Sequence, residues 1–255
     1  MERAETPNAE DGDTHRDAFC DGTLRSVRIA RVTPIRGVLF DWGDTLFSPP
    51  DAGSVIVAAA AERGVHIEAT KARALWDELW VAGKMPEELA KGRDLSADAH
   101  REVWTALFER ANGAVPDIAS TLYERVMDPR AWIPYPDTAP TLRALRSRGV
   151  RIGIVSNVPR DLRPIFTAHG LAELVDAYTH SFEVGAEKPD PRIFQRASEA
   201  LGTPPRDTLM VGDHPVADAG AIVAGLRFYL LPPDGAPDAP RGLDRVVAII
   251  DASQD

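Results

Sequence analysis

Two short apolar runs in this 255-residue sequence are each followed by acidic residues. Asp41 comes directly after the run at residues 38–40. Asp213 and Asp218 follow the run at residues 209–211. Such runs are typical of buried strands, and the carboxyl ends of parallel strands form the ligand crevices of open α/β sheets. A carboxylate at a buried strand end is costly unless it holds a cation or attacks an electrophile. The pattern therefore predicts a metal-binding or catalytic site.

A hydroxyl, an amide and a lysine lie between these acids in the sequence. Ser156 and Asn157 end a third apolar run, and Lys188 stands just before a Pro-Asp pair that signals the start of a helix. Taken singly, each of these residues is more typical of a turn or a solvated surface than of a binding site. The information lies in their order along the chain, which is acid, hydroxyl, lysine and acid pair.

This ordered set of motifs resembles the haloacid dehalogenase-like hydrolase superfamily. The resemblance covers residues 37–231, with a variable insert between the first two motifs. It implies an α/β fold with a doubly wound, Rossmann-like parallel sheet as its core and an inserted all-helical cap domain. It also implies that the cap closes over the active site and selects the substrate.

The acids need a cation if they are to lie together. Asp41, Asp213 and Asp218 would otherwise repel one another, and hard oxygen ligands with open water positions suit Mg²⁺. The resemblance implies that the backbone carbonyl of Gly43 completes the protein ligands of this ion. It further implies that Asp41 is the nucleophile and forms an aspartyl-phosphate.

A phosphorylated substrate is itself an anion, so an aspartate can attack it only where negative charge is neutralised. The resemblance assigns that role to Lys188, which would neutralise both the nucleophile and the phosphoryl group. It assigns the binding of phosphoryl oxygens to Ser156 and Asn157 with neighbouring backbone amides. Asp41 and Lys188 are therefore the expected catalytic residues.

One position departs from the pattern of the phosphatases in this superfamily. They usually carry a second aspartate two residues after the nucleophile, which protonates the leaving oxygen and later activates water. Here that position is Gly43, and the acid Asp44 stands one residue later. Because a one-residue offset in a tight turn changes the direction of a side chain, we expect Asp44 to point elsewhere. We expect His214 to be a solvated loop histidine.

Other branches of the superfamily lack the second acid, including hydrolases of carbon–halogen and carbon–phosphorus bonds. Trp42 beside the nucleophile resembles the carbon–phosphorus branch, which needs a cap lysine for an imine. Lys84 lies in the right region but no convincing histidine follows it. The carbon–halogen branch works without metal, so the acid pair near residues 213–218 argues against it.

The chain is predicted to have three parts. Residues 1–34 read as a disordered, acidic leader without a signal peptide, residues 35–48 and 136–255 as the Rossmann-like core, and residues 49–135 as the helical cap domain. Strands are expected at residues 151–155, 177–181, 207–212 and 226–231, with a helix at 217–224 and an edge strand at 246–250. Most tryptophans lie in or beside the insert at helical spacing, which favours packing of the insert over a substrate wall.

Composition narrows the class of protein. The net charge of −10 argues against a nucleic-acid partner, no stretch reaches the length of a membrane span, and the single cysteine fits a cytoplasmic protein. The expected function is Mg²⁺-dependent hydrolysis of a small phosphorylated metabolite. The alternatives are phosphonate or carbon–halogen hydrolysis on the same core, or a phosphate-binding regulatory protein with little turnover. The oligomeric state and the substrate are not readable from the sequence.

Overall fold

The computed structural model describes residues 33–232 and 236–254. The leader predicted at residues 1–34 therefore lies outside the described residues, except for Thr33 and Pro34. Within the described ranges, no helix combines the length and the apolar character that a membrane span requires.

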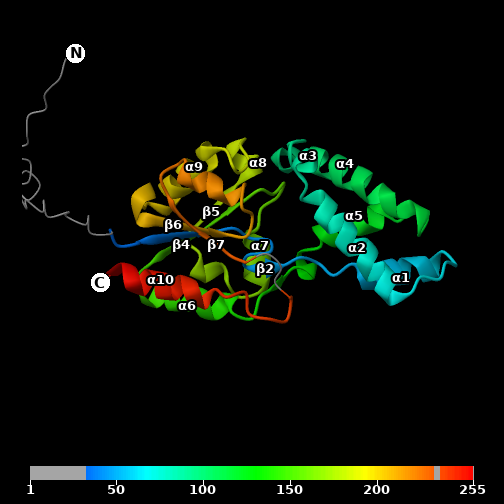
Figure 1. The fold of residues 1–255 in the computed structure, drawn as a ribbon, viewed down its shortest axis with the longest axis horizontal. Coiled ribbons are helices and arrows are strands. Elements are labelled where there is room, and N and C mark those ends of the chain that lie inside the picture. Colours follow the sequence, from blue (N-terminus) through cyan, green and yellow to red (C-terminus); the bar gives the residue numbers. More distant parts are fainter. Residues whose placement is uncertain (1–32, 233–235, 255) are drawn as a thin grey trace, which may run out of the picture. The chain divides into compact units, whose positions relative to one another are not determined.

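Five parallel strands form the central sheet, as the alternation of apolar runs and helices predicts (Figure 1). Its order is β5-β4-β1-β6-β7, so β1 lies at the centre and the chain winds first to one side and then to the other. This is the predicted doubly wound arrangement. The strands are β1 (Gly37–Phe40), β4 (Arg151–Ser156), β5 (Ala177–His180), β6 (Thr208–Gly212) and β7 (Arg227–Leu230).

Alternate residues of β1 pack against helices on opposite faces of the sheet. Val38 and Phe40 belong to one apolar cluster and Leu39 to another, and all three are fully buried. A strand that is covered on both faces must be apolar throughout, which explains why β1 reads as a continuous apolar run. Figure 1 shows one layer of helices above the sheet and one below it. The helices are α8 (Ser181–Val184) and α9 (Pro191–Leu201) in one layer, and α6 (Thr138–Ser147) and α10 (Asp244–Gln254) in the other. The helix α7 (Arg163–Ala168) packs its Phe166 on Phe47, which follows β1 in the chain.

The segment between β1 and α6 is a helical insert. Its ends meet in a short antiparallel pair, in which β2 (Phe47–Ser48) lies beside β3 (Ile133–Pro134). β3 lies within residues 49–135, where the sequence predicts only helices. The sequence pattern misses this strand because two residues are too few to show the alternation of a strand. The helices of the insert are α1 (Gly53–Glu62), α2 (Ala69–Gly83), α3 (Pro86–Leu89), α4 (Ala97–Phe108) and α5 (Ala119–Met127), with 3₁₀ turns at Arg93–Leu95, Glu109–Gly113 and Pro129–Ala131.

Tryptophan rings connect the insert to the core. Trp42, which follows β1, packs on Trp132 with the ring centroids 4.0 Å apart. Within the insert, Trp80 stacks on Trp104 at 5.5 Å. These contacts are part of one buried apolar cluster that also contains Phe40 of the sheet. The tryptophans therefore pack the insert, as the helical spacing predicts.

Two of the predicted elements are wrong. Residues 246–250 form part of the helix α10 rather than an edge strand, with Val246 and Ile250 buried one turn apart. A short apolar run fits either structure, and burial at i and i+4 selects the helix here. The helix predicted at residues 217–224 is only a 3₁₀ turn, Asp218–Ile222. Gly220 of this turn lies so close to the backbone of Pro189 that a β-carbon there would be 2.4 Å from the Pro189 carbonyl oxygen.

The helix α10 predicts that substitutions at two nearby positions change the free energy of unfolding by very different amounts. Ala248 is exposed on the helix but would face the same side as Ile250 in a strand. We expect Ala248→Glu to change the free energy of unfolding by less than about 0.5 kcal/mol, and Ile250→Ala to lower it by about 2–5 kcal/mol. Urea unfolding of both variants measures this. A large loss of stability in Ala248→Glu would contradict the helix.

Candidate active site

The predicted site residues converge at the carboxyl end of β1. Asp41 directly follows β1, Ser156 ends β4 on one side, and Asp213 directly follows β6 on the other side. The strand order reverses at β1, and such a switch point opens a crevice between the loops of a doubly wound sheet. Residues that are 172 positions apart in the chain, from Asp41 to Asp213, therefore meet at one place.

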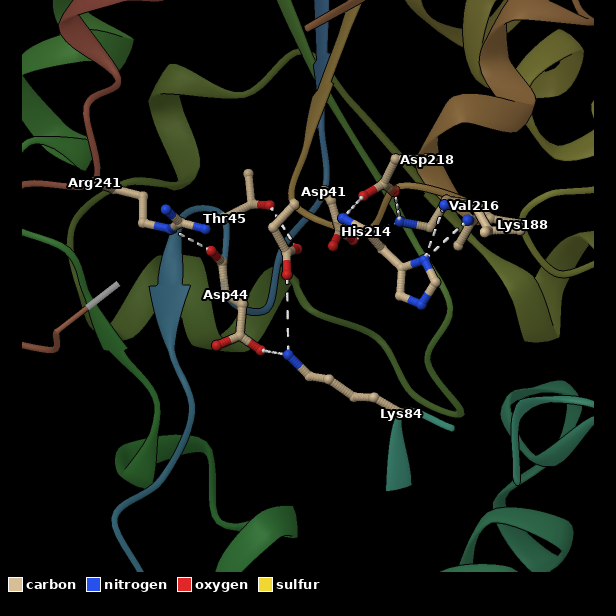
Figure 2. A network of polar contacts seen from close by, with 11 residues as sticks. Asp41, Asp44, Thr45, Lys84, Lys188, His214, Val216, Asp218 and Arg241 are labelled. Carbon is tan, nitrogen blue, oxygen red and sulfur yellow. Dashed lines mark hydrogen bonds and ion pairs between the residues drawn. The ribbon is translucent and has the colours of Figure 1, made fainter. Parts of the chain in front are cut away.

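Three carboxylates gather there around one lysine. Asp41, Asp213 and Asp218 each offer an oxygen atom, and these atoms all lie within 4.8 Å of one another. Lys188 donates to Asp41 at 2.7 Å and to Asp218 at 2.6 Å, and its side chain is 4% exposed (Figure 2). Asp41, Asp213, Asp218 and Lys188, which the sequence singles out for charge chemistry, thus form one cluster.

Asp218 is held by three neighbours. One carboxylate oxygen accepts from Lys188 and the other accepts from the backbone N–H of His214 at 2.9 Å. The carboxylate also lies against Gly212, where a β-carbon would be only 2.1 Å from an Asp218 oxygen. A residue larger than glycine at position 212 would therefore displace this acid from the site.

Burial and charge together shift the pKa values of the cluster. Burial, with the charges of Asp41 and Asp44, raises the pKa of Asp213 to about 7. Burial also raises the pKa of Asp218 to about 6, against the opposing pull of Lys188. Burial works against the charge of Lys188 as well, but Asp218 and Asp41 outweigh it and raise the pKa of this ammonium.

Asp44 does not point away from the site, contrary to expectation. Its carboxylate accepts from Lys84 of the insert at 2.6 Å, and the same ammonium lies 3.9 Å from Asp213 (Figure 2). The reason is the backbone of the turn, because Asp44 has a φ of 57°. In this left-handed conformation the side chain leaves the turn in another direction than in an ordinary tight turn. Lys84 thus reaches the site across 40 residues of sequence.

Two further contacts support the turn after Asp41, and sequence reasoning missed both. Thr45 donates to Asp213 at 3.2 Å. Arg241, from the segment before α10, donates to the backbone carbonyl of Asp44 at 2.6 Å. No local signal marks Arg241, which lies 197 residues from its partner.

Gly43, expected as a backbone metal ligand, lies on the wall of the site beneath Trp132. A β-carbon at position 43 would be 3.2 Å from the Trp132 ring. The position at which the resemblance implies a second acid is therefore covered by an aromatic side chain of the insert.

The two residues expected to bind phosphoryl oxygens have different surroundings. Ser156 is buried and lines the site. The side chain of Asn157 donates to the backbone carbonyl of Lys188 at 3.1 Å and accepts from its N–H at 2.8 Å. The amide of Asn157 thus fixes the lysine loop, and its contact with substrate stays a prediction. His214, expected in solvent, lines the site and accepts from the backbone N–H groups of Val216 and Ala217.

The carboxylate cluster opens into a cavity of about 640 Å³ between the sheet and the insert. Core residues such as Asp41 and Lys188 line one part, and insert residues line another. The insert contributes three tryptophans to the wall, so these rings are both packing residues and cavity surface. They are Trp80, Trp104 and Trp132.

Comparison with known proteins gives relatives that include phosphatases. The chain is 31% identical over 200 residues to a glyceraldehyde 3-phosphate phosphatase from Methanothermobacter thermautotrophicus, covering 77% of this chain and 85% of that protein. It is 36% identical over 160 residues to a phosphoserine phosphatase from Thermus thermophilus, covering 59% of this chain and 64% of that protein. Matches to some other relatives span about half of the relative's length.

A solved structure described as a dehalogenase with an intermediate complex matches with a TM-score of 0.63 and 23% identity, over 86% of this chain and 98% of that one. At this identity the similarity shows the fold alone. A family model described as haloacid dehalogenase-like hydrolase matches residues 35–225, a range that contains the whole carboxylate cluster and the insert. The chain therefore belongs to the haloacid dehalogenase-like hydrolase family and is a hydrolase.

Proposed function

We propose that this hydrolase cleaves small phosphoric monoesters, with Asp41 as the nucleophile and Mg²⁺ as the cofactor. The main support is the contact of one buried ammonium, Lys188, with both Asp41 and Asp218 beside Asp213. This arrangement places a cation next to an acid at the mouth of a cavity, which is what attack on an anionic phosphoryl group requires. The phosphatases among the relatives support the same reaction class.

In the proposed first step, an oxygen of Asp41 attacks phosphorus and the bond between phosphorus and the ester oxygen breaks. The ester oxygen leaves with the bonding electron pair and takes a proton from water. Lys188 stays protonated and balances the charge of the nucleophile and of the phosphoryl oxygens. The hydroxyl of Ser156 donates to one of these oxygens. A water molecule then attacks phosphorus and the bond between phosphorus and the Asp41 oxygen breaks, which releases inorganic phosphate and a proton and regenerates the carboxylate of Asp41.

The acids of the site fit a divalent cation. Asp41, Asp44, Asp213 and Asp218 surround only two ammonium groups, those of Lys84 and Lys188, so the ionised site has an excess of negative charge. Carboxylate oxygens are the ligands that Mg²⁺ prefers. Asp41, Asp213 and the Gly43 carbonyl would hold the ion, with Asp218 in support. When bound, Mg²⁺ would neutralise charge on the phosphoryl group and orient it.

The helical insert, residues 49–135, is proposed to act as a cap domain on a core of residues 35–48 and 136–255. Two observations support this role. The insert leaves and rejoins the core through the β2–β3 pair, and its tryptophans form part of the cavity wall. A cap of this kind would select the leaving group of the substrate.

Phosphonate hydrolysis is the second candidate, because Lys84 of the insert lies beside the carboxylates. An imine requires an unprotonated amine. Burial opposes the charge of Lys84, but Asp44 and Asp213 outweigh it and raise the pKa of the ammonium. This environment favours the phosphoric monoester reaction over an imine mechanism.

The first experiment tests the nucleophile and the cofactor together. Phosphate release from a panel of phosphorylated metabolites and aryl phosphates is measured for the wild type and Asp41→Asn, with Mg²⁺ and with EDTA. We expect release by the wild type only with Mg²⁺, and a loss of at least ~10³-fold in Asp41→Asn because the attacking oxygen is gone. Circular dichroism checks that the variant is folded. Equal phosphate release in EDTA would show that the reaction needs no divalent cation and would overturn the assignment of Mg²⁺ as the cofactor.

The raised pKa of Asp213 predicts a pH-dependent stability. The folded state holds this proton more tightly than the unfolded chain, so ionisation costs stability as the pH rises from the ordinary value of 3.8 to about 7. Asp213→Asn removes that cost. In EDTA, its Tm should therefore rise relative to the wild type through this window and then level off. A few degrees is the expected scale, since about 1 kcal/mol shifts the Tm of such a protein by roughly 2–4 °C.

Mg²⁺ is the control for the same experiment. It should stabilise the wild type more than Asp213→Asn, because the variant lacks a ligand, and so should reduce the difference at neutral pH. A Tm difference that does not change with pH would show that Asp213 ionises at its ordinary pKa.

The glycine at position 43 predicts a preference for good leaving groups. No carboxylate occupies the usual acid position, and Asp44 is engaged by Lys84. The plot of log kcat/KM against leaving-group pKa should therefore fall steeply from aryl to alkyl phosphates. Asp44→Asn should lower the rates for aryl and alkyl phosphates by the same factor, because the change removes the ion-pair partner of Lys84 and not the acid that protonates the leaving group. A selective loss of about 10²–10⁴-fold for alkyl phosphates would show that Asp44 is the acid after all.

A further inference from the structure

Arg160 is a core arginine on the wall of the cavity. It lies in the loop after β4, four residues beyond Ser156, and is half-buried. Its guanidinium donates to the backbone carbonyls of Met127 and Val126 at the carboxyl end of α5. Its central carbon lies 6.0 Å from the centre of the Trp42 ring. Two backbone contacts and one aromatic contact thus fix the guanidinium at the junction of core and insert.

Every other lysine and arginine among the described residues of the wall has a carboxylate beside it. Lys188 contacts Asp41 and Asp218, and Lys84 contacts Asp44. Arg93 lies 3.5 Å from Asp94, and Arg192 lies 2.7 Å from Asp190; none of the ion pairs of the described residues includes Arg160.

Nearby ionisable groups compensate the charge of Arg160 only in part. His100 is neutral, because burial and the charges of Arg93 and Arg160 lower its pKa to about 3. Asp94 lies closest to Arg93 at 3.5 Å and to His100 at 3.7 Å. Asp128 and Tyr123 act on Arg160 only over a longer range. A partly buried cation without an anion is unfavourable, so this part of the wall is suited to an anionic ligand group.

We propose that Arg160 binds a carboxylate on the leaving group of the phosphoric monoester. The inference rests on the proposed phosphatase function and adds the substrate class. A guanidinium has five N–H donors in a planar fork, and the two bonds to backbone carbonyls leave donors for a carboxylate. The indole rings of Trp42, Trp80, Trp104 and Trp132 line the same cavity and suit a flat apolar body. The substrate is thus an aryl-like phosphate that carries a carboxylate.

Matched pairs of aryl phosphates test this assignment. We choose 3- and 4-carboxyphenyl phosphate, each paired with its carboxamide, so that the two members differ mainly in charge. In the wild type, at least one carboxylate should have a kcat/KM about 10- to 100-fold above that of its carboxamide, as expected for one charged hydrogen-bonded pair. In Arg160→Gln this ratio should fall toward one, mainly through a higher KM for the carboxylate.

Arg192→Gln is the matched control. Arg192 also lines the cavity, but it is paired with Asp190 and its side chain is 67% exposed, so the ratio should stay at the wild-type value. Arg160→Lys keeps the charge without the planar fork and should retain part of the preference. This variant, and the wild-type ratio itself, keep the test decisive if Arg160→Gln does not fold.

The outcomes separate this inference from the proposed function. If no aryl phosphate releases phosphate in the presence of Mg²⁺, the phosphatase proposal fails. If phosphate is released but the wild type prefers neither carboxylate over its carboxamide, the assignment of Arg160 is wrong while the phosphatase proposal stands. A preference that persists in Arg160→Gln and disappears in Arg192→Gln would likewise overturn it.

Discussion

Neutralisation of buried negative charge is the constraint on which the site depends. Asp218 is fully buried and Lys188 nearly so, and neither charge would be stable in that place without the other. Two uncharged residues support this contact. Gly212 gives Asp218 the space to approach, and Asn157 fixes the backbone of Lys188 from both sides. The ends of β1 and β4 and the turn after β6 are thereby tied to one lysine residue.

The turn after Asp41 depends on a distant part of the chain. Arg241 donates to the carbonyl of Asp44, and the carboxylate of Asp137 accepts from the backbone N–H groups of residues 241–243. These bonds join the start of α6, the segment before α10 and the loop of the nucleophile. They hold the left-handed conformation of Asp44, which is costly for a residue with a side chain. The geometry at Asp41 is therefore a property of the whole core rather than of a local motif.

The sheet could be predicted because its strands are buried on both faces and so appear as apolar runs. The convergence of Asp41, Ser156, Lys188, Asp213 and Asp218 then follows from strand order. What could not be predicted depends on contacts between distant residues. Lys84 meets Asp44 across 40 positions and Arg241 meets it across 197, and neither pair has a sequence signal. The error at residues 246–250 has another cause, since a five-residue apolar run fits both a strand and a helix.

Gly43 connects the chemistry of the core with the packing of the insert. The resemblance to phosphatases of the superfamily implies an acid at this position, whereas here the Trp132 ring lies over it and packs against Trp42. A β-carbon at position 43 would lie 3.2 Å from the Trp132 ring, so a side chain there would require this ring to shift. The chain thus has a wall of indole rings where a proton donor would otherwise stand. If the insert selects the leaving group as proposed, recognition of the leaving group and its protonation would both depend on this position, over which the Trp132 ring lies.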